Sequence, residues 1–110
     1  RVHYPGLSSS HSHGLATRLM PGHGGVVSFE LEDGKKALKL LSLLGFVKTA
    51  PSLGGTETLI THPASSSHRG ISPQERKELG ISGSLLRLSI GLEETEDIIE
   101  DLARALKAVR

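Results

Sequence analysis

The sequence predicts an α/β (α+β) sandwich, in which helices pack on one small mixed or antiparallel sheet. Apolar residues recur at helical spacing in some segments and at alternate positions in others. These segments follow one another as helix, strand, helix, strand, strand, helix, strand and helix, an order that favours one layered core. At 110 residues the chain is long enough for one domain and too short for two, so residues 1–110 are expected to form a single domain.

Local signals place the elements along the chain. Helices are expected at 12–20, 34–44, 73–79 and 96–110, and strands at 26–31, 46–49, 57–62 and 84–91. Pro21-Gly22 stops the first helix, while Asp33 can cap the second and Gly45 can end it at the C′ position. The run Ser72-Pro73-Gln74-Glu75 is a capping box with proline at the first helical position, and it starts the third helix.

The last strand and the last helix have the clearest periodicity. One face of the strand is apolar, through Leu86, Leu88 and Ile90, and Arg87 lies on the opposite face. Thr95 can cap the helix that follows. The expected buried stripe of that helix consists of Ile98, Ile99, Leu102, Leu106 and Val109.

Composition excludes several functional classes. The chain has 13 Lys and Arg against 12 Asp and Glu, so no basic excess exists to hold nucleic acid, and no nucleic-acid partner is expected. The longest apolar run, residues 40–47, is far too short to span a membrane, so no membrane partner is expected. Because the chain has no cysteine, a disulfide framework, a thiolate zinc site and a cysteine nucleophile are excluded.

Several chemistry-bearing motifs are weak. His11 and His13 could place two imidazoles on one side of an extended segment, but no third ligand lies nearby in sequence, so they are expected to be solvated and no metal site is expected. A Ser-His-acid triad lacks its G-x-S-x-G turn. The glycine-rich runs 22–25 and 52–55 both precede strands, whereas phosphate loops lead into helices, so tight turns are expected instead.

Arg87 is the most informative single residue. A guanidinium in the middle of a strand, flanked by large aliphatic side chains, needs an anionic partner if it is buried or half-buried. Its planar fork suits a carboxylate. Three interpretations stay open on the residues alone: recognition of a ligand, an internal ion pair with Glu57 or Glu30, or an exposed charge on the sheet.

Several motifs together resemble one family. The runs SLGGTETLITHPASSSH at 52–68 and GISGSLLRLSIGLEETEDIIEDLARAL at 80–106 resemble the C-terminal domain of the pyridoxal-phosphate (PLP) dependent Cys/Met metabolism enzymes. These include cystathionine γ-synthase, cystathionine γ-lyase, methionine γ-lyase and O-acetylhomoserine sulfhydrylase. VHYPGL at 2–7 and GHGGVVSFEL at 22–31 agree in order. The resemblance covers essentially the whole chain, and with a first residue of Arg1 it implies a fragment of a longer enzyme.

The resemblance implies a role for four residues. Arg87 matches the arginine that grips the substrate α-carboxylate, Ser52 matches a serine beside the cofactor lysine and the substrate, and Leu53 follows it in the pocket wall. Ser67 stands where the family commonly has threonine. The family often has Met-Thr-His at the positions that Ser66-Ser67-His68 occupy here. No residue of this chain is expected to be catalytic, and no lysine has the sequence context of the one that bonds PLP.

The resemblance also implies what surrounds the chain. The cofactor, pyridoxal 5'-phosphate, is expected to be bound by a missing upstream domain, so the fragment alone should be inactive. The complete enzyme is expected to be cytoplasmic and a homotetramer, and to act on sulfur amino acids or activated homoserine by γ-elimination or γ-replacement. Which substrate and which of the two reactions stay open. The alternative is a stand-alone, non-catalytic domain of the same fold that binds a small carboxylate or a protein partner.

Overall fold

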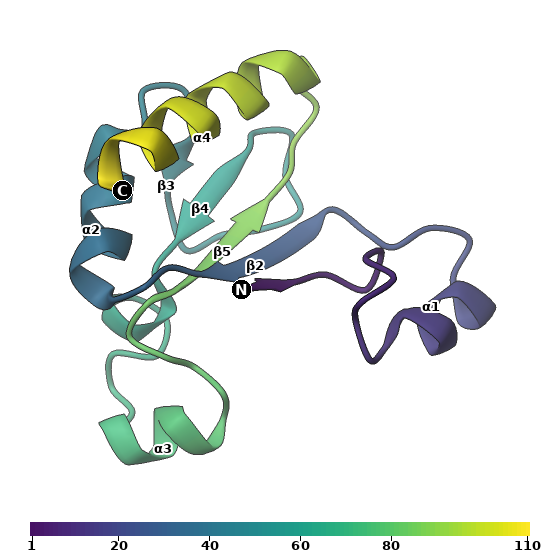
Figure 1. Ribbon diagram of the computed structural model, residues 1–110, viewed down its shortest axis with the longest axis horizontal. Coiled ribbons are helices and arrows are strands. Elements are labelled where there is room, and N and C mark those ends of the chain that lie inside the picture. Colours follow the sequence, from purple (N-terminus) through teal and green to yellow (C-terminus); the bar gives the residue numbers. More distant parts are fainter.

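A five-stranded mixed sheet organises the computed structural model, which describes residues 1–110 (Figure 1). The strand order is β1-β2-β5-β4-β3, with β3 and β4 parallel and the other pairs antiparallel. The elements are β1 (Val2–His3), α1 (His13–Leu19), β2 (Val26–Glu30), α2 (Gly34–Leu43), β3 (Lys48–Thr49), β4 (Leu59–Thr61), the 3₁₀ turn η1 (Pro63–Ser65), α3 (Pro73–Glu78), β5 (Leu85–Ser89) and α4 (Thr95–Val109). The predicted α/β fold class is confirmed, and β1 and η1 are additions that the sequence pattern did not predict.

The core lies between one face of the sheet and the helix pair α2 and α4, which run side by side over it (Figure 1). Its nine buried residues are Ala37, Leu40, Val47, Ile60, Leu86, Leu88, Ile98, Ala105 and Val109. Helices α1 and α3 stand away from this core, α1 at the right of the view and α3 at its lower end (Figure 1). The face of β5 that carries Leu86 and Leu88 is therefore the covered face, as the alternation predicts.

The helix starts follow local chemistry. The capping box at α3 is confirmed: the Ser72 hydroxyl accepts from the Glu75 N–H, and the Glu75 carboxylate accepts from the Ser72 N–H at 3.0 Å. At α2 the Asp33 carboxylate accepts from the Lys36 N–H at 2.8 Å, as predicted. Gly45 follows the C-cap of α2, but it does not adopt the left-handed conformation usual at C′.

Two predictions about α4 are wrong. Glu94 rather than Thr95 is the N-cap, and no side chain caps this helix end. Ile99 is 59% exposed, whereas Asp101 and Ala105 are buried. The buried positions run at intervals of three and four residues from Ile98, and this stripe leaves Ile99 about 100° away, towards solvent.

The strands are shorter than the apolar pattern predicts. The expected strand at 46–49 pairs only at Lys48 and Thr49, because the Phe46 and Val47 N–H groups donate to Asp101 instead. The expected strand at 57–62 is paired at 59–61, and that at 84–91 at 85–89.

Candidate functional site

Arg87 occupies the central strand on the face that α2 and α4 leave uncovered. It pairs with Ser28 on β2 and with Thr61 on β4, so its side chain stands between two neighbouring strands. The residue is half-buried. Its Nη2 donates to the backbone carbonyls of Pro51 at 2.9 Å and Ser52 at 3.2 Å. The loop between β3 and β4 is thus held against the guanidinium.

No carboxylate of this chain pairs with Arg87. The three ion pairs of the structure join other residues. The two internal partners considered from the sequence are both wrong: Glu57 makes no side-chain hydrogen bond to it, and Glu30 is instead bonded to His3 at 2.6 Å and Ser82 at 2.9 Å. These two bonds, the one to His3 first, lower the pKa of Glu30. The carboxylate of Glu30 is therefore bonded to His3 and Ser82 and does not pair with Arg87.

The Arg87 guanidinium is left with unused donors. Its Nε is buried and has no hydrogen-bond partner, and Nη1 makes no hydrogen bond within the chain. A buried donor without an acceptor costs about 1–3 kcal/mol. Nη1 is the donor left open to an anion such as a carboxylate, because Nε is covered and lies on the opposite edge of the guanidinium. The guanidinium therefore has no anionic partner within this chain and keeps donors that no residue of the chain satisfies.

The other site residues named from the sequence are placed differently. The backbone carbonyl of Ser52 accepts a hydrogen bond from Arg87, while the residue itself is exposed. Leu53, the next residue, is 53% exposed. Ser67 is exposed and its hydroxyl contacts His68 at 2.8 Å; no hydrogen bond joins it to Arg87. Its neighbour Ser66 is the one whose hydroxyl reaches Thr61, at 2.8 Å.

Sequence reasoning missed the residues that hold the loop around Arg87. Ser89, two residues along the same face of β5, accepts from the Gly54 N–H at 2.9 Å. Glu93 accepts from both the N–H and the hydroxyl of Thr58, at 2.6 and 2.7 Å, and these two bonds lower its pKa. The one signal for Ser89 in the sequence was a small polar residue at an alternate position of a strand.

The glycine and histidine motifs are structural. Gly24 and Gly54 have φ of +80° and +76°, which confirms tight turns in the runs 22–25 and 52–55. The His13 Nδ1 bonds to the Pro5 carbonyl at 2.8 Å, and its ring stacks on His23. No group of three or more metal-ligating side chains is present.

The lysines of this chain do not fit the role of holding PLP. A lysine that bonds the cofactor covalently lies buried, where its pKa falls. Five of the six lysines are exposed, and the sixth, Lys36, pairs with Glu32, which raises its pKa. None of the six hydrogen-bonds or pairs with Arg87 or with the loop at 51–57.

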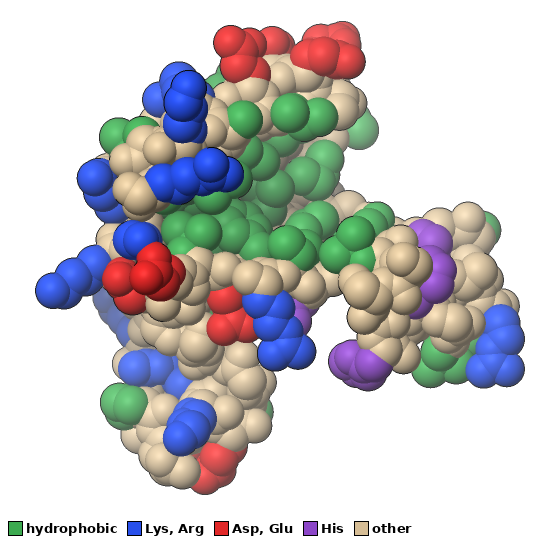
Figure 2. Space-filling model, in the orientation of Figure 1, with side chains coloured by type: hydrophobic (Ala, Val, Ile, Leu, Met, Phe, Trp, Pro, Cys, Tyr) green, Lys and Arg blue, Asp and Glu red, His purple; other side chains and the backbone are tan.

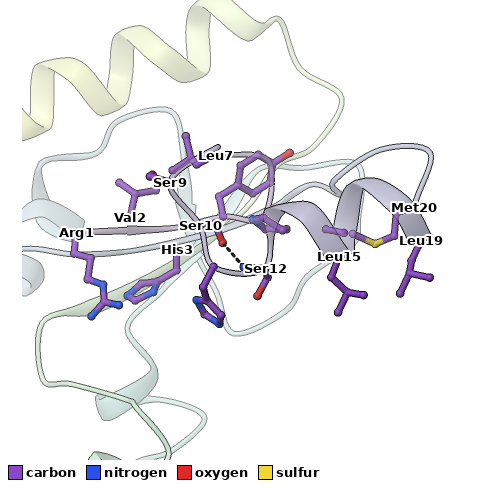
Figure 3. Close-up of a pocket in the computed structure, with 14 residues that line it drawn as sticks. Arg1, Val2, His3, Leu7, Ser9, Ser10, Ser12, Leu15, Leu19 and Met20 are labelled. Carbon is purple, nitrogen blue, oxygen red and sulfur yellow. Dashed lines mark hydrogen bonds between the residues drawn. The ribbon is translucent and has the colours of Figure 1, made fainter.

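A large hollow lies elsewhere on the molecule. Its volume is about 920 Å³, and it is lined by 14 residues between Arg1 and Met20, from the N-terminal segment and α1 (Figure 3). No residue of β5 or of the 51–57 loop lines it. Figure 2 shows hydrophobic side chains gathered between α4 and this N-terminal part.

None of the helices combines the length and the apolar character that crossing a membrane requires.

Comparison with known proteins gives a consistent result. Residues 1–107 match the family model described as Cys/Met metabolism PLP-dependent enzyme. The chain is 47% identical over 110 residues to L-methionine gamma-lyase of Fusobacterium nucleatum subsp. polymorphum, covering 99% of this chain and 28% of that protein. It is 42% identical over 110 residues to O-succinylhomoserine sulfhydrylase of Pseudomonas aeruginosa, covering 99% and 27%.

A solved structure agrees with these relatives. The crystal structure of cystathionine gamma synthase from Xanthomonas oryzae pv. oryzae in complex with cystathionine superposes with a TM-score of 0.93 at 43% identity, covering 99% of this chain and 28% of that one. The chain thus spans little more than a quarter of the length of these relatives. It belongs to the Cys/Met metabolism PLP-dependent enzyme family.

Proposed function

We propose that this chain is the C-terminal, substrate-side domain of a PLP-dependent transsulfuration enzyme, and that Arg87 binds the α-carboxylate of its amino-acid substrate. One observation carries the proposal: a half-buried guanidinium on the sheet has no anionic partner in the chain, and its Nη1 makes no hydrogen bond. Buried charges are ordinarily paired, so an anion from outside the chain supplies the missing partner.

Arg87 acts by binding and orienting the substrate. The carbonyls of Pro51 and Ser52 fix Nη2, and thereby the plane of the guanidinium. A carboxylate bonded in that plane loses rotational freedom, which contributes to the rate by holding the reacting carbon in one orientation. Ser52 and Leu53 lie at the open edge of this site, where they contact the rest of the substrate.

The cofactor and the covalent chemistry belong to residues outside this chain. PLP supplies the electron sink that stabilises a carbanion at the substrate α-carbon. Since no lysine here fits the bond to PLP, the upstream domain holds the cofactor, and the 110-residue chain alone is inactive. The complete enzyme is a cytoplasmic homotetramer in this proposal.

The substrate class is sulfur amino acids or activated homoserine, with γ-elimination or γ-replacement as the reaction. The two relatives compared above are named for methionine and for O-succinylhomoserine. Both compounds carry the same α-amino carboxylate, so recognition through Arg87 serves either one and does not choose between them.

Replacing Arg87 with lysine in the complete enzyme tests the proposal. Lysine keeps the charge and loses the forked donor geometry. Loss of about 1.5–3 kcal/mol of charge-assisted hydrogen bonding corresponds to a fall in kcat/KM of roughly ten- to a hundred-fold, expressed mainly as a higher KM. The matched control is Arg69→Lys, because Arg69 is exposed and its side chain makes no hydrogen bond. Normal kinetics in an Arg87→Lys enzyme that unfolds more easily would make Arg87 a structural residue.

A further inference from the structure

The loop that holds Arg87 is itself fastened to the strand that carries Arg87. Residues 50–58 connect β3 with β4, and four of them are exposed glycines or small polar residues that give the loop no apolar anchor of its own. Hydrogen bonds to β5 and to the segment after β5 replace that anchor. The conformation of the loop therefore depends on residues distant in sequence.

Ser89 provides the central fastening point. It is 2% exposed, an unusual degree of burial for a serine in a strand. Its hydroxyl oxygen accepts from the Gly54 N–H at 2.9 Å, at the residue where the loop bends with a φ of +76°. Because Ser89 and Arg87 are two residues apart on one strand, both side chains meet the same loop.

Glu93 and Gly91 fasten the end of the loop. The Glu93 carboxylate accepts two hydrogen bonds from Thr58, and the Thr58 hydroxyl accepts in turn from the Gly91 N–H at 2.9 Å. The Leu92 N–H donates to the Thr56 carbonyl at 2.9 Å. A Cβ at Gly91 would clash with the Thr56 carbonyl, so the close approach of the two segments requires glycine.

We infer that Ser89 is a positioning residue of the Arg87 site, assisted by the Glu93–Thr58 contact. Ser89 fixes the turn at Gly54, the turn fixes the carbonyls of Pro51 and Ser52, and these carbonyls fix the guanidinium that meets the carboxylate. The inference rests on the proposed function for its effect on substrate binding. The ordering of Arg87 by Ser89 is independent of that function.

Ser89→Ala tests the inference in two measurements. In the 110-residue chain, the Arg87 Nε–H should exchange with solvent at least about tenfold faster by NMR, because the loop that buries it loses its anchor. In the complete enzyme, KM for the amino acid should rise about tenfold while kcat stays within about twofold, since a misplaced binding group weakens positioning. Ser89→Thr retains the hydroxyl and should restore both values towards those of the wild type.

Ser28→Ala is the matched control. Ser28 lies directly across from Arg87 on β2, yet its side chain makes no hydrogen bond to the loop. It should leave both measurements unchanged. If Ser89→Ala does not fold, Glu93→Gln is the second variant, because it removes the charge that Thr58 contacts while keeping the side-chain shape. It should change both measurements in the same direction.

The outcomes separate this inference from the proposed function. An unchanged exchange rate of the Arg87 Nε–H in Ser89→Ala overturns the positioning role. A KM within about twofold of wild type also overturns it, provided that Arg87→Lys has raised KM in the same enzyme. If Arg87→Lys leaves KM unchanged, the proposed function fails, and the exchange rate in the 110-residue chain still decides whether Ser89 orders Arg87.

Discussion

Replacing Asp101 with asparagine should destabilise this fold more than any other single change of charge on α4. Asp101 is 6% exposed, and its carboxylate accepts from the backbone N–H groups of Gly45, Phe46 and Val47, each at 2.9 Å. Arg104 donates to the same carboxylate. One side chain thus ties the end of α2 and the start of β3 to the middle of α4.

The magnitude follows from counting acceptors. Each carboxylate oxygen accepts two hydrogen bonds, whereas asparagine keeps one oxygen and presents an amide NH₂ in place of the other. Two donors therefore lose their acceptor. Hydrogen bonds to charged groups contribute about 1.5–3 kcal/mol each, and the two donors on Oδ1, from Gly45 and Arg104, belong to exposed residues, so an amide placed there gives an expected loss of about 3 kcal/mol. For a domain of this size that loss lowers Tm by roughly 12 °C.

Thermal unfolding followed by circular dichroism at neutral pH measures the effect. Glu100→Gln is the matched control, because it removes the same charge from an exposed neighbour whose side chain makes no hydrogen bond. The control should melt within about 2 °C of the wild type, as surface substitutions usually do. An Asp101→Asn chain that melts within the same interval would refute the account of how α2, β3 and α4 are joined.

Two further predictions concern the pKa of Asp101 and the absence of a lysine that fits the bond to PLP. The hydrogen bonds to Asp101 outweigh the effect of its burial and lower its pKa from 3.8 to about 2, so it contributes about 2 kcal/mol of stability above pH 4 that is lost as pH falls from 4 to 2. Urea unfolding across this pH interval gives the free energies of unfolding of the wild type and of Asp101→Asn, and the difference between them should shrink as pH falls. A difference that stays constant would contradict the lowered pKa of Asp101. The 110-residue chain should not bond PLP: borohydride reduction followed by mass spectrometry should find no stoichiometric label, whereas full labelling of one lysine would contradict the absence of a fitting lysine.

The features predicted correctly from the sequence are those decided by neighbours along the chain. The capping box at Ser72 and the cap at Asp33 need partners only three residues away, so the pattern contains everything that forms them. The alternation in 85–89 likewise placed Arg87 on the face opposite the core.

The features that were missed depend on contacts between distant residues. The sequence analysis did not single out Asp101, because its three backbone partners lie 54 to 56 residues away and a backbone N–H is not encoded by any particular residue type. For the same reason the sequence did not predict that the carbonyls of Pro51 and Ser52 bond to Arg87, or that the Gly54 N–H bonds to Ser89. A polar residue at a buried position of a helix or strand was the one available signal.

The central claim, that Arg87 recognises a carboxylate, is tested most directly by pairing Arg87→Lys with removal of that carboxylate from the ligand. Inhibition constants of the complete enzyme are measured for a non-reactive amino acid and for the corresponding amine without the carboxyl group. The account predicts that Arg87→Lys raises the inhibition constant of the amino acid roughly ten- to a hundred-fold. The inhibition constant of the amine should stay within about twofold of its wild-type value, because the substitution acts only through the carboxylate. Equal weakening of both ligands, or of neither, would contradict it.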